Sequence, residues 1–201
     1  MAFRYLLVAV LAYLLGCCNG AIITSKLFFK EDVRSHGSGN AGLTNFQRSY
    51  GGWLTLVVIG VDVVKAVLAC LLGRWLVGSA AAMMLGGLCV IVGHMFPVFF
   101  GFRGGKGILS GAAVAATMDW RILLVILVVF LIAVVLTRYV SLGSCLAAVV
   151  YPFGFLWRFW GDWVTVAMAA VVAAGAIFMH RANIARLVQG TERKLSFHSK
   201  R

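Results

Sequence analysis

Long apolar runs, separated by short polar connections, constrain the fold of this chain more than any other feature. A helix that crosses the hydrocarbon core of a bilayer needs about 20 mostly apolar residues. Seven apolar runs occur, at 3–28, 53–77, 79–100, 107–118, 120–137, 140–157 and 163–179, and all but 107–118 approach or exceed this length. Of the 201 residues, 62% are hydrophobic and 12% are charged, whereas a soluble domain has about 45–50% apolar residues. We therefore predict an all-α, polytopic integral membrane protein that forms a single domain over residues 1–201.

Two of these runs need individual interpretation. The run at 107–118 is short and rich in Gly, Ala and Ser, which is typical of a buried or tilted half-helix rather than a lipid-facing span. The first run passes through Leu14-Leu15-Gly16-Cys17, which is similar to a lipoprotein cleavage box, but it continues to Ile23. It is therefore predicted to be a transmembrane helix and not a cleaved signal. The sequence predicts about seven transmembrane helices, one of them short or broken.

The charges of the chain are strongly unbalanced, with 18 Lys and Arg against 6 Asp and Glu, a net charge of +12. With the N-terminus outside, 13 basic residues fall on the inner side, four fall on the outer side, and Lys65 lies within a run. An excess of Lys and Arg on the cytoplasmic side sets membrane orientation, so we predict an N-out, C-in topology. Orientation explains most of the charge without nucleic acid, and residues 193–201 are expected to form a basic, disordered cytoplasmic tail.

The residues on each side are as follows. The inner residues are Lys26, Lys30, Arg34, Arg48, Arg103, Lys106, Arg138, Arg181, Arg186, Arg193, Lys194, Lys200 and Arg201. The outer residues are Arg4, Arg74, Arg121 and Arg158.

Two polar, glycine-rich stretches interrupt the apolar sequence, at 34–52 and 101–107, and both fall on the predicted inner side. Glycines let backbone amides converge on one point, and such amides form an anion-binding nest. Basic side chains within the stretches favour a phosphate or a carboxylate as the ligand. The alternative is that both are flexible loops whose Lys and Arg only maintain topology. An ATP-hydrolysing P-loop is excluded, because Gly107 follows Lys106 where that motif has Ser or Thr.

A third polar stretch follows the last apolar run. His180, Asn183 and Leu187 share one face of a predicted helix, with Arg186 beside them. His180 has three possible roles, as a general base, a phosphate ligand or an interfacial cap, and spacing alone favours the cap.

Ionisable residues within the apolar runs are the remaining candidates. Asp62 and Lys65 form an i, i+3 pair, and such residues in a span are functional candidates by default. We favour a neutralising pair that fixes helix packing, with Lys65 directed toward the inner polar site. His94 is interpreted as a buried hydrogen-bonding residue. The five cysteines lack metal-ligand spacing, so neither a metal site nor a cofactor is expected.

The three polar stretches together resemble the motifs of the bacterial acyl-phosphate-dependent glycerol-3-phosphate acyltransferase family (PlsY-type), in order and in spacing. The matching segments are 37–45 with Arg48 and Gly51, 93–107, and 180–192. The chain departs from the family at Arg103, where Lys is common, at Ser110, where Thr is common, and at Ala182, where an acidic residue is common. Because Ala182 has no carboxylate, no general base is assigned there.

The resemblance implies transfer of a fatty acyl group from acyl phosphate to the 1-hydroxyl of glycerol 3-phosphate, the first step of phospholipid biosynthesis. Lysophosphatidic acid and phosphate are the implied products. It further implies a multi-pass protein, expected to be a monomer, in the lipid of the bacterial inner membrane, with its active site at the cytoplasmic face.

The resemblance also implies roles for individual residues. The implied catalytic residues are Ser38, Arg48, Lys106, His180 and Asn183. The implied substrate-binding residues are Gly37, Gly39, Asn40, Thr44, Asn45, Lys65, Arg103, Gly104, Gly105 and Gly107. Structural roles are expected for Asp62, His94 and Glu192.

The mechanism is a hypothesis with one step left open. Lys106 and loop amides are expected to bind acyl phosphate, and Arg48 to hold glycerol 3-phosphate. Ser38 is interpreted as a hydrogen-bond donor rather than an acyl-accepting nucleophile. Either His180 or an oxygen of the acyl phosphate takes the hydroxyl proton. The alternative function is a transporter for a phosphorylated metabolite. The absence of an inverted repeat in the sequence argues against it.

Overall fold

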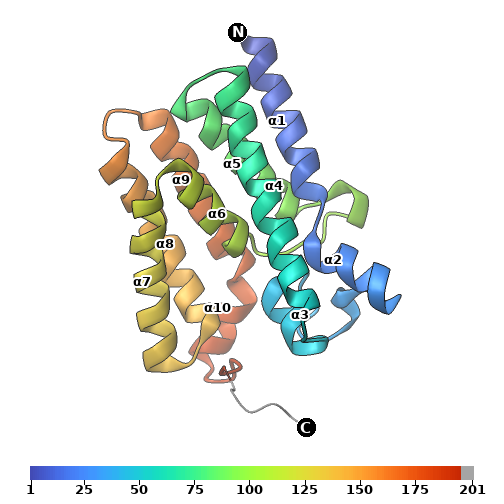
Figure 1. Cartoon of the computed structure of the whole chain (residues 1–201). Coiled ribbons are helices and arrows are strands. Elements are labelled where there is room, and N and C mark those ends of the chain that lie inside the picture. Colours follow the sequence, from blue (N-terminus) through green and yellow to red (C-terminus); the bar gives the residue numbers. More distant parts are fainter. Residues whose placement is uncertain (196–201) are drawn as a thin grey trace. The chain divides into compact units, whose positions relative to one another are not determined.

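The computed structural model of the chain describes residues 1–195, and every regular element among them is helical (Figure 1). The predicted all-α fold class is therefore confirmed for the described residues. Most of the expected basic tail, residues 196–201, lies outside the described residues. The chain divides into two compact units, Met1–Met118 and Asp119–Arg201, which are described separately.

The first unit contains four long or medium helices and several short elements. The long and medium helices are α1 (Ala2–Cys17), α4 (Leu54–Leu76), α5 (Ala80–Met95) and α6 (Ile108–Met118). The short elements are α2 (Gly20–Thr24), the π-helical turn η1 (Ser25–Phe29), the 3-10 turn η2 (Val33–Ser35), α3 (Leu43–Ser49) and the 3-10 turn η3 (Val98–Phe100). The second unit contains α7 (Trp120–Thr137), α8 (Val140–Arg158), α9 (Trp163–Met179) and α10 (Arg181–Val188).

Among residues 1–195, five helical segments are long and apolar enough to cross a membrane. They are Ala2–Phe29, Leu54–Leu76, Ala80–Phe100, Trp120–Thr137 and Val140–Arg158. A sixth is obtained if α9 and α10, which are bent by 56° at their junction, form one span. The short run at 107–118 is α6, an apolar helix of 11 residues. Seven spans and the N-out orientation stay predictions.

Helix α5 packs closely against both α1 and α4 in the first unit. A Cβ atom at Gly93 would overlap the carbonyl oxygen of Tyr13 in α1, and one at Gly86 would overlap that of Ala69 in α4. Small residues at such contacts let helix backbones approach within van der Waals distance. The glycines of α5 therefore determine the spacing of three helices.

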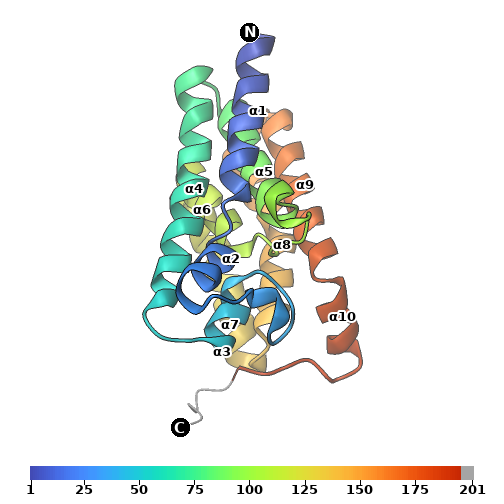
Figure 2. The same cartoon turned by 90° about the vertical axis from the view of Figure 1, so that its right-hand side faces the viewer.

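The first unit has polar connections at both ends of its helices. At one end, Arg4 of α1 donates from Nη1 to the carbonyl oxygen of Leu76, 3.2 Å away, beside the α4–α5 connection. The opposite end carries α2, α3 and the loops around them, seen below α1 in Figure 2. Both glycine-rich stretches lie in these loops and in the connection that follows α5.

Candidate functional site

The first glycine-rich stretch is folded around the buried side chain of Asn45 in α3. Its Oδ1 accepts hydrogen bonds from the backbone amide and the hydroxyl of Ser38, at 2.8 and 3.1 Å. Its Nδ2 donates to the carbonyl oxygens of Val33 and His36, both at 3.0 Å. Gly37 has a φ of 60°, and a Cβ atom there would overlap Asn45 Oδ1. Asn45 therefore positions Ser38, which is exposed on the loop.

A second buried amide, that of Asn19, supports the same stretch from the break between α1 and α2. Asn19 Oδ1 accepts from the amide of Ile22 at 3.0 Å and so caps α2, and its Nδ2 donates to the carbonyl of Ala41 at 3.0 Å. The hydroxyl of Ser25 accepts from the amide of Val33 at 3.1 Å. Neither Asn19 nor Ser25 is among the site residues predicted from the sequence. A lone Asn before Gly20 in an apolar run is the available signal, because Asn favours helix N-caps.

The second glycine-rich stretch folds back onto the end of α5. The amides of Gly104 and Gly105 donate to the carbonyls of Met95 and His94, each at 3.0 Å. A Cβ atom at Gly105 would overlap the imidazole of His94. The amide cradle expected here is therefore not made by Gly104 and Gly105, since α5 accepts both N–H groups. Lys106 is partly exposed next to the start of α6.

The ion pair predicted between Asp62 and Lys65 is confirmed, and it belongs to a buried cluster. Lys65 Nζ lies 2.7 Å from Asp62 Oδ1, 3.0 Å from His94 Nδ1 and 3.0 Å from the carbonyl oxygen of Cys18. Asp62 Oδ1 also accepts from the amide of Gly20 at 3.2 Å. The sequence also predicts a substrate contact for Lys65, but its side chain is 4% exposed and its ammonium is enclosed by protein groups. The cluster thus joins α4, α5 and the α1–α2 break.

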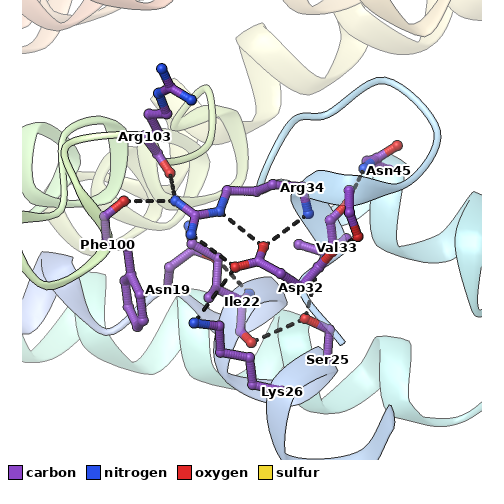
Figure 3. A network of polar contacts seen from close by, with 11 residues as sticks. Asn19, Ile22, Ser25, Lys26, Asp32, Val33, Arg34, Asn45, Phe100 and Arg103 are labelled. Atoms are coloured by element: carbon purple, nitrogen blue, oxygen red, sulfur yellow. Dashed lines mark hydrogen bonds and ion pairs between the residues drawn. The ribbon is translucent and has the colours of Figure 1, made fainter. Parts of the chain in front are cut away.

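One ion pair lies where the two glycine-rich stretches meet (Figure 3). The guanidinium of Arg34 forms two parallel hydrogen bonds to the Asp32 carboxylate. It also donates to the carbonyl oxygens of Phe100, directly before the second stretch, and of Arg103 within it. The side-chain hydrogen bond from Arg34 lowers the pKa of Asp32 to about 2. From the sequence alone, Arg34 is predicted to have only a topological role.

The third motif lies at the bend between α9 and α10 in the second unit. His180 is 2% exposed, and its Nδ1 lies 2.8 Å from the carbonyl oxygen of Ala176. Because a carbonyl only accepts, Nδ1 carries the hydrogen of this contact, which fixes the orientation of the ring. In the neutral form of a ring held in this way, the lone pair is at Nε2, as a general base requires.

Glu192 closes the turn that follows α10. Its carboxylate accepts from Asn183 Nδ2 at 2.7 Å and from Arg186 Nε at 2.6 Å. Burial raises the pKa of Glu192, but the hydrogen bonds from these two residues outweigh it and hold the pKa below its usual range. The contacts agree with the structural role expected for Glu192.

The predicted residues are thus distributed over both units. The first unit carries Ser38, Arg48 and Lys106, and Arg48 and Thr44 are exposed on α3. The second unit carries His180 and Asn183. Within residues 1–195, no three His, Cys, Asp or Glu side chains are grouped so as to hold a metal ion.

Comparison with known proteins gives one consistent result. The family profile described as glycerol-3-phosphate acyltransferase matches residues 6–190. Glycerol-3-phosphate acyltransferase of Thermoanaerobacter pseudethanolicus is 43% identical over 189 residues, which cover 94% of each chain. The protein of the same name from Listeria monocytogenes is 36% identical over 98% of this chain and 100% of its own length.

Two solved structures have the same fold. Both are crystal structures of PlsY (YgiH), an integral membrane glycerol 3-phosphate acyltransferase. The glycerol 3-phosphate form superposes with a TM-score of 0.88 at 34% identity and covers 96% of both chains. The lysophosphatidic acid form has a TM-score of 0.85 at 33% identity, over 96% of this chain and 95% of the other.

Proposed function

The chain belongs to the glycerol-3-phosphate acyltransferase family, and we propose that its acyl donor is acyl phosphate and its acceptor the 1-hydroxyl of glycerol 3-phosphate. It is an integral membrane acyltransferase. One observation carries the choice of donor and acceptor: two glycine-rich stretches, one with Ser38 and Arg48 and the other with Arg103 and Lys106, are joined at one end of the first unit. Both substrates carry phosphate, which suits this set of cations.

The basic side chains bind the phosphates. Arg48 is planar and forms bidentate hydrogen bonds to phosphate oxygens, which suits it to hold glycerol 3-phosphate. Lys106 binds the acyl phosphate as a compact point charge and offsets the charge that develops as phosphate leaves. Arg103, exposed in the same stretch, adds to the positive potential. Ser38, oriented by Asn45, forms a hydrogen bond to a substrate oxygen.

The chemical step is a direct acyl transfer. The 1-hydroxyl oxygen attacks the carbonyl carbon, the bond from that carbon to the phosphate oxygen breaks, and inorganic phosphate leaves. The proton of the hydroxyl passes to Nε2 of His180, whose Nδ1–H is held by the carbonyl of Ala176. Asn183 binds the substrate at the same motif. Because acyl phosphate is an activated mixed anhydride, positioning supplies much of the acceleration.

We propose further that the protein works as a monomer in the bacterial inner membrane, with the site at the cytoplasmic face. The enclosure of Lys65 among protein groups favours a role in positioning for this residue rather than in substrate binding. No cofactor or metal ion is needed for the reaction as written.

The donor is tested with purified protein in detergent. Glycerol 3-phosphate is offered with acyl phosphate or with an acyl thioester, and lysophosphatidic acid and inorganic phosphate are measured. Product is expected from acyl phosphate alone, and turnover with the thioester alone would overturn the donor assignment. Because detergent micelles have no compartments, turnover there also separates catalysis from transport.

The role of Ser38 has a matched control in the same stretch. Ser38→Ala is expected to lower kcat by about 100-fold, as for the loss of one hydrogen-bond donor to the reacting group. Ser35 is also exposed, and its hydroxyl donates to the carbonyl of Asp32 at 2.7 Å, so Ser35→Ala should retain activity. A covalent acyl–Ser38 species, trapped and located by mass spectrometry, would refute direct transfer.

The role of His180 is tested separately. His180→Ala is expected to lower kcat by about 100-fold or more, since general bases contribute about 10²–10⁴. Near-normal turnover in this variant would assign the proton to an oxygen of the acyl phosphate instead.

A further inference from the structure

We propose that Arg34 is a positioning residue that fixes the second glycine-rich stretch, 101–107, against the first and thereby sets the place of Lys106. This inference deepens the proposed function and rests on it for the role of Lys106. Arg34 is not assigned to phosphate binding here, because its donors are directed at protein acceptors.

The guanidinium of Arg34 bridges two segments that are far apart in sequence (Figure 3). Its Nη1 donates to the carbonyl oxygens of Phe100 and Arg103, at 2.7 and 2.9 Å. Its Nε and Nη2 donate to the two carboxylate oxygens of Asp32, at 2.9 and 2.8 Å. Four of the five N–H groups of the guanidinium are thus engaged, two on each side of the bridge.

The near side of the bridge is held by several polar contacts. Asp32 accepts from the backbone amide of Arg34 at 3.0 Å, which caps the turn η2. Lys26 Nζ lies 3.6 Å from the same carboxylate and 5.4 Å from the centre of the Phe100 ring. The amide of Val33 donates to the hydroxyl of Ser25. These contacts support Arg34 from its own side of the bridge.

The far side of the bridge is a strained chain reversal. Gly101 and Phe102 have φ values of 66° and 58°, and a non-glycine residue in this region costs about 1 kcal/mol or more. The amides of Phe102 and Gly104 donate back to Pro97 and Met95, both at 3.0 Å. These bonds hold the stretch from the α5 side, and Arg34 holds it from the side of the first stretch.

The geometry requires arginine at this position. A planar fork reaches two carbonyl oxygens and both oxygens of a carboxylate at once, whereas a lysine ammonium acts as a single point charge. Arg34→Lys would retain the charge but lose the bridge. Charge and positioning are therefore separable by experiment.

The test uses the full chain in detergent with three variants, Arg34→Ala, Arg34→Lys and Arg4→Ala. Arg4 is the matched control, because its guanidinium also donates to a backbone carbonyl, that of Leu76, at the opposite end of the same unit. Hydrogen exchange of peptides covering 98–107 reports the placement of the stretch without relying on activity. Turnover of glycerol 3-phosphate and acyl phosphate reports how the placement of this stretch affects catalysis.

The bridge predicts three results together. Arg34→Ala exchanges faster over 98–107, and its kcat/KM falls by about 100-fold, the loss that a displacement of about 1 Å can cause. Guanidinium ion, at concentrations that leave the unfolding midpoint unchanged, restores both protection and turnover. Arg34→Lys remains impaired, while Arg4→Ala behaves like the unmodified chain.

Other results overturn the proposal. Unchanged exchange over 98–107 in Arg34→Ala would refute the bridge, and faster exchange with unchanged kcat/KM would refute its importance for Lys106. If Arg34→Ala does not fold, Asp32→Asn replaces it, with faster exchange expected in the same peptides. If the unmodified chain has no turnover with either donor, the proposed function fails, and the exchange data still decide whether Arg34 holds the stretch.

Discussion

Lys65 shows how a charged residue is accommodated in an apolar helix. An isolated charge in a span is costly, so it is found paired or hydrogen-bonded. The ammonium of Lys65 lies on Asp62, His94 and the carbonyl of Cys18, and the carboxylate of Asp62 also caps the start of α2 through the amide of Gly20. The pair therefore links helix packing to the α1–α2 break that supports the first glycine-rich stretch.

Removal of Lys65 alone should destabilise the protein strongly. Lys65→Met leaves the Asp62 carboxylate buried without its cation, a change that costs about 3–5 kcal/mol. The double variant Asp62→Asn/Lys65→Met should recover most of this loss, because Asn keeps an acceptor for Gly20. The midpoint of detergent-induced unfolding measures both. Lys26→Met is the control, since Lys26 is half exposed in its ion pair with Asp32 and should cost less than about 1 kcal/mol. A single variant as stable as the double would contradict this account.

Glu192 should make the end of α10 sensitive to acid. Its pKa in the folded protein is lowered, because the hydrogen bonds from Asn183 and Arg186 outweigh burial. The ionised Glu192 carboxylate therefore stabilises the fold at pH values above its ordinary pKa of 4.5. This stabilisation is lost as the pH falls through the pKa of Glu192 in the folded protein. Glu192→Gln should therefore cost about 1–2 kcal/mol at neutral pH and progressively less below pH 4.5. Unfolding midpoints of both chains, measured from neutral to acid pH, check this, and a constant difference would argue against it.

At the residue scale, the sequence predicts which residues belong to the site better than it predicts the groups that these residues contact. Ser38, Asn45 and Lys106 stand out because polar residues among glycines are rare in so apolar a chain. That Asn45 is buried and organises the Ser38 loop could not be predicted, since this depends on the folded path of residues 33–38. Arg34 was missed for the same reason: its acceptors at Phe100 and Arg103 lie more than 60 residues away in sequence.

At the scale of elements, the apolar runs predict helices because the backbone must satisfy its own hydrogen bonds in lipid. The structure follows these runs for the long helices. It adds α3 and the junction at Asn19, which are determined by local caps and buried amides within otherwise polar or continuous segments. The 56° bend after α9 also has no periodic signal in the sequence, because it arises at a single residue, His180.

The close packing of α5 predicts different effects for two glycines. Gly93→Ala should force α5 away from the carbonyl of Tyr13 in α1 and cost about 1–3 kcal/mol, as overpacking does. Gly60 of α4 has open space around its Cα, so Gly60→Ala should leave stability unchanged or raise it by up to about 1 kcal/mol. Unfolding midpoints of the two variants, with equal expression as a check, provide the measurement. Equal effects at the two positions would refute the role of Gly93 in helix spacing.

At the scale of the whole chain, the basic residues are sorted by helix end within each unit. In the first unit, Arg4 contacts the α4–α5 connection, while Arg34 and Arg103 lie in the linked glycine-rich stretches. In the second unit, Arg158 is paired with Asp119 at 2.6 Å before α7. There the amide of Leu195 donates to the carbonyl of Arg138 after α7, and Lys194 lies over the ring of Tyr139. Within each unit, basic residues that are predicted to lie on the same side of the membrane are therefore found at the same end of the helices.

This sorting predicts the orientation of the first unit in the membrane. Because the end with the glycine-rich stretches carries more Lys and Arg, it should face the cytoplasm. Single cysteines at Ala2 and Ser35, both exposed, report the two ends in a chain whose native cysteines are replaced. In sealed right-side-out vesicles, an impermeant thiol reagent should label Ala2→Cys at once and Ser35→Cys only after permeabilisation. Ser199→Cys, outside the described residues, should label with Ser35→Cys. The reverse pattern would invert the topology and place the acyltransferase site on the outer face, away from a cytoplasmic supply of phosphorylated substrates.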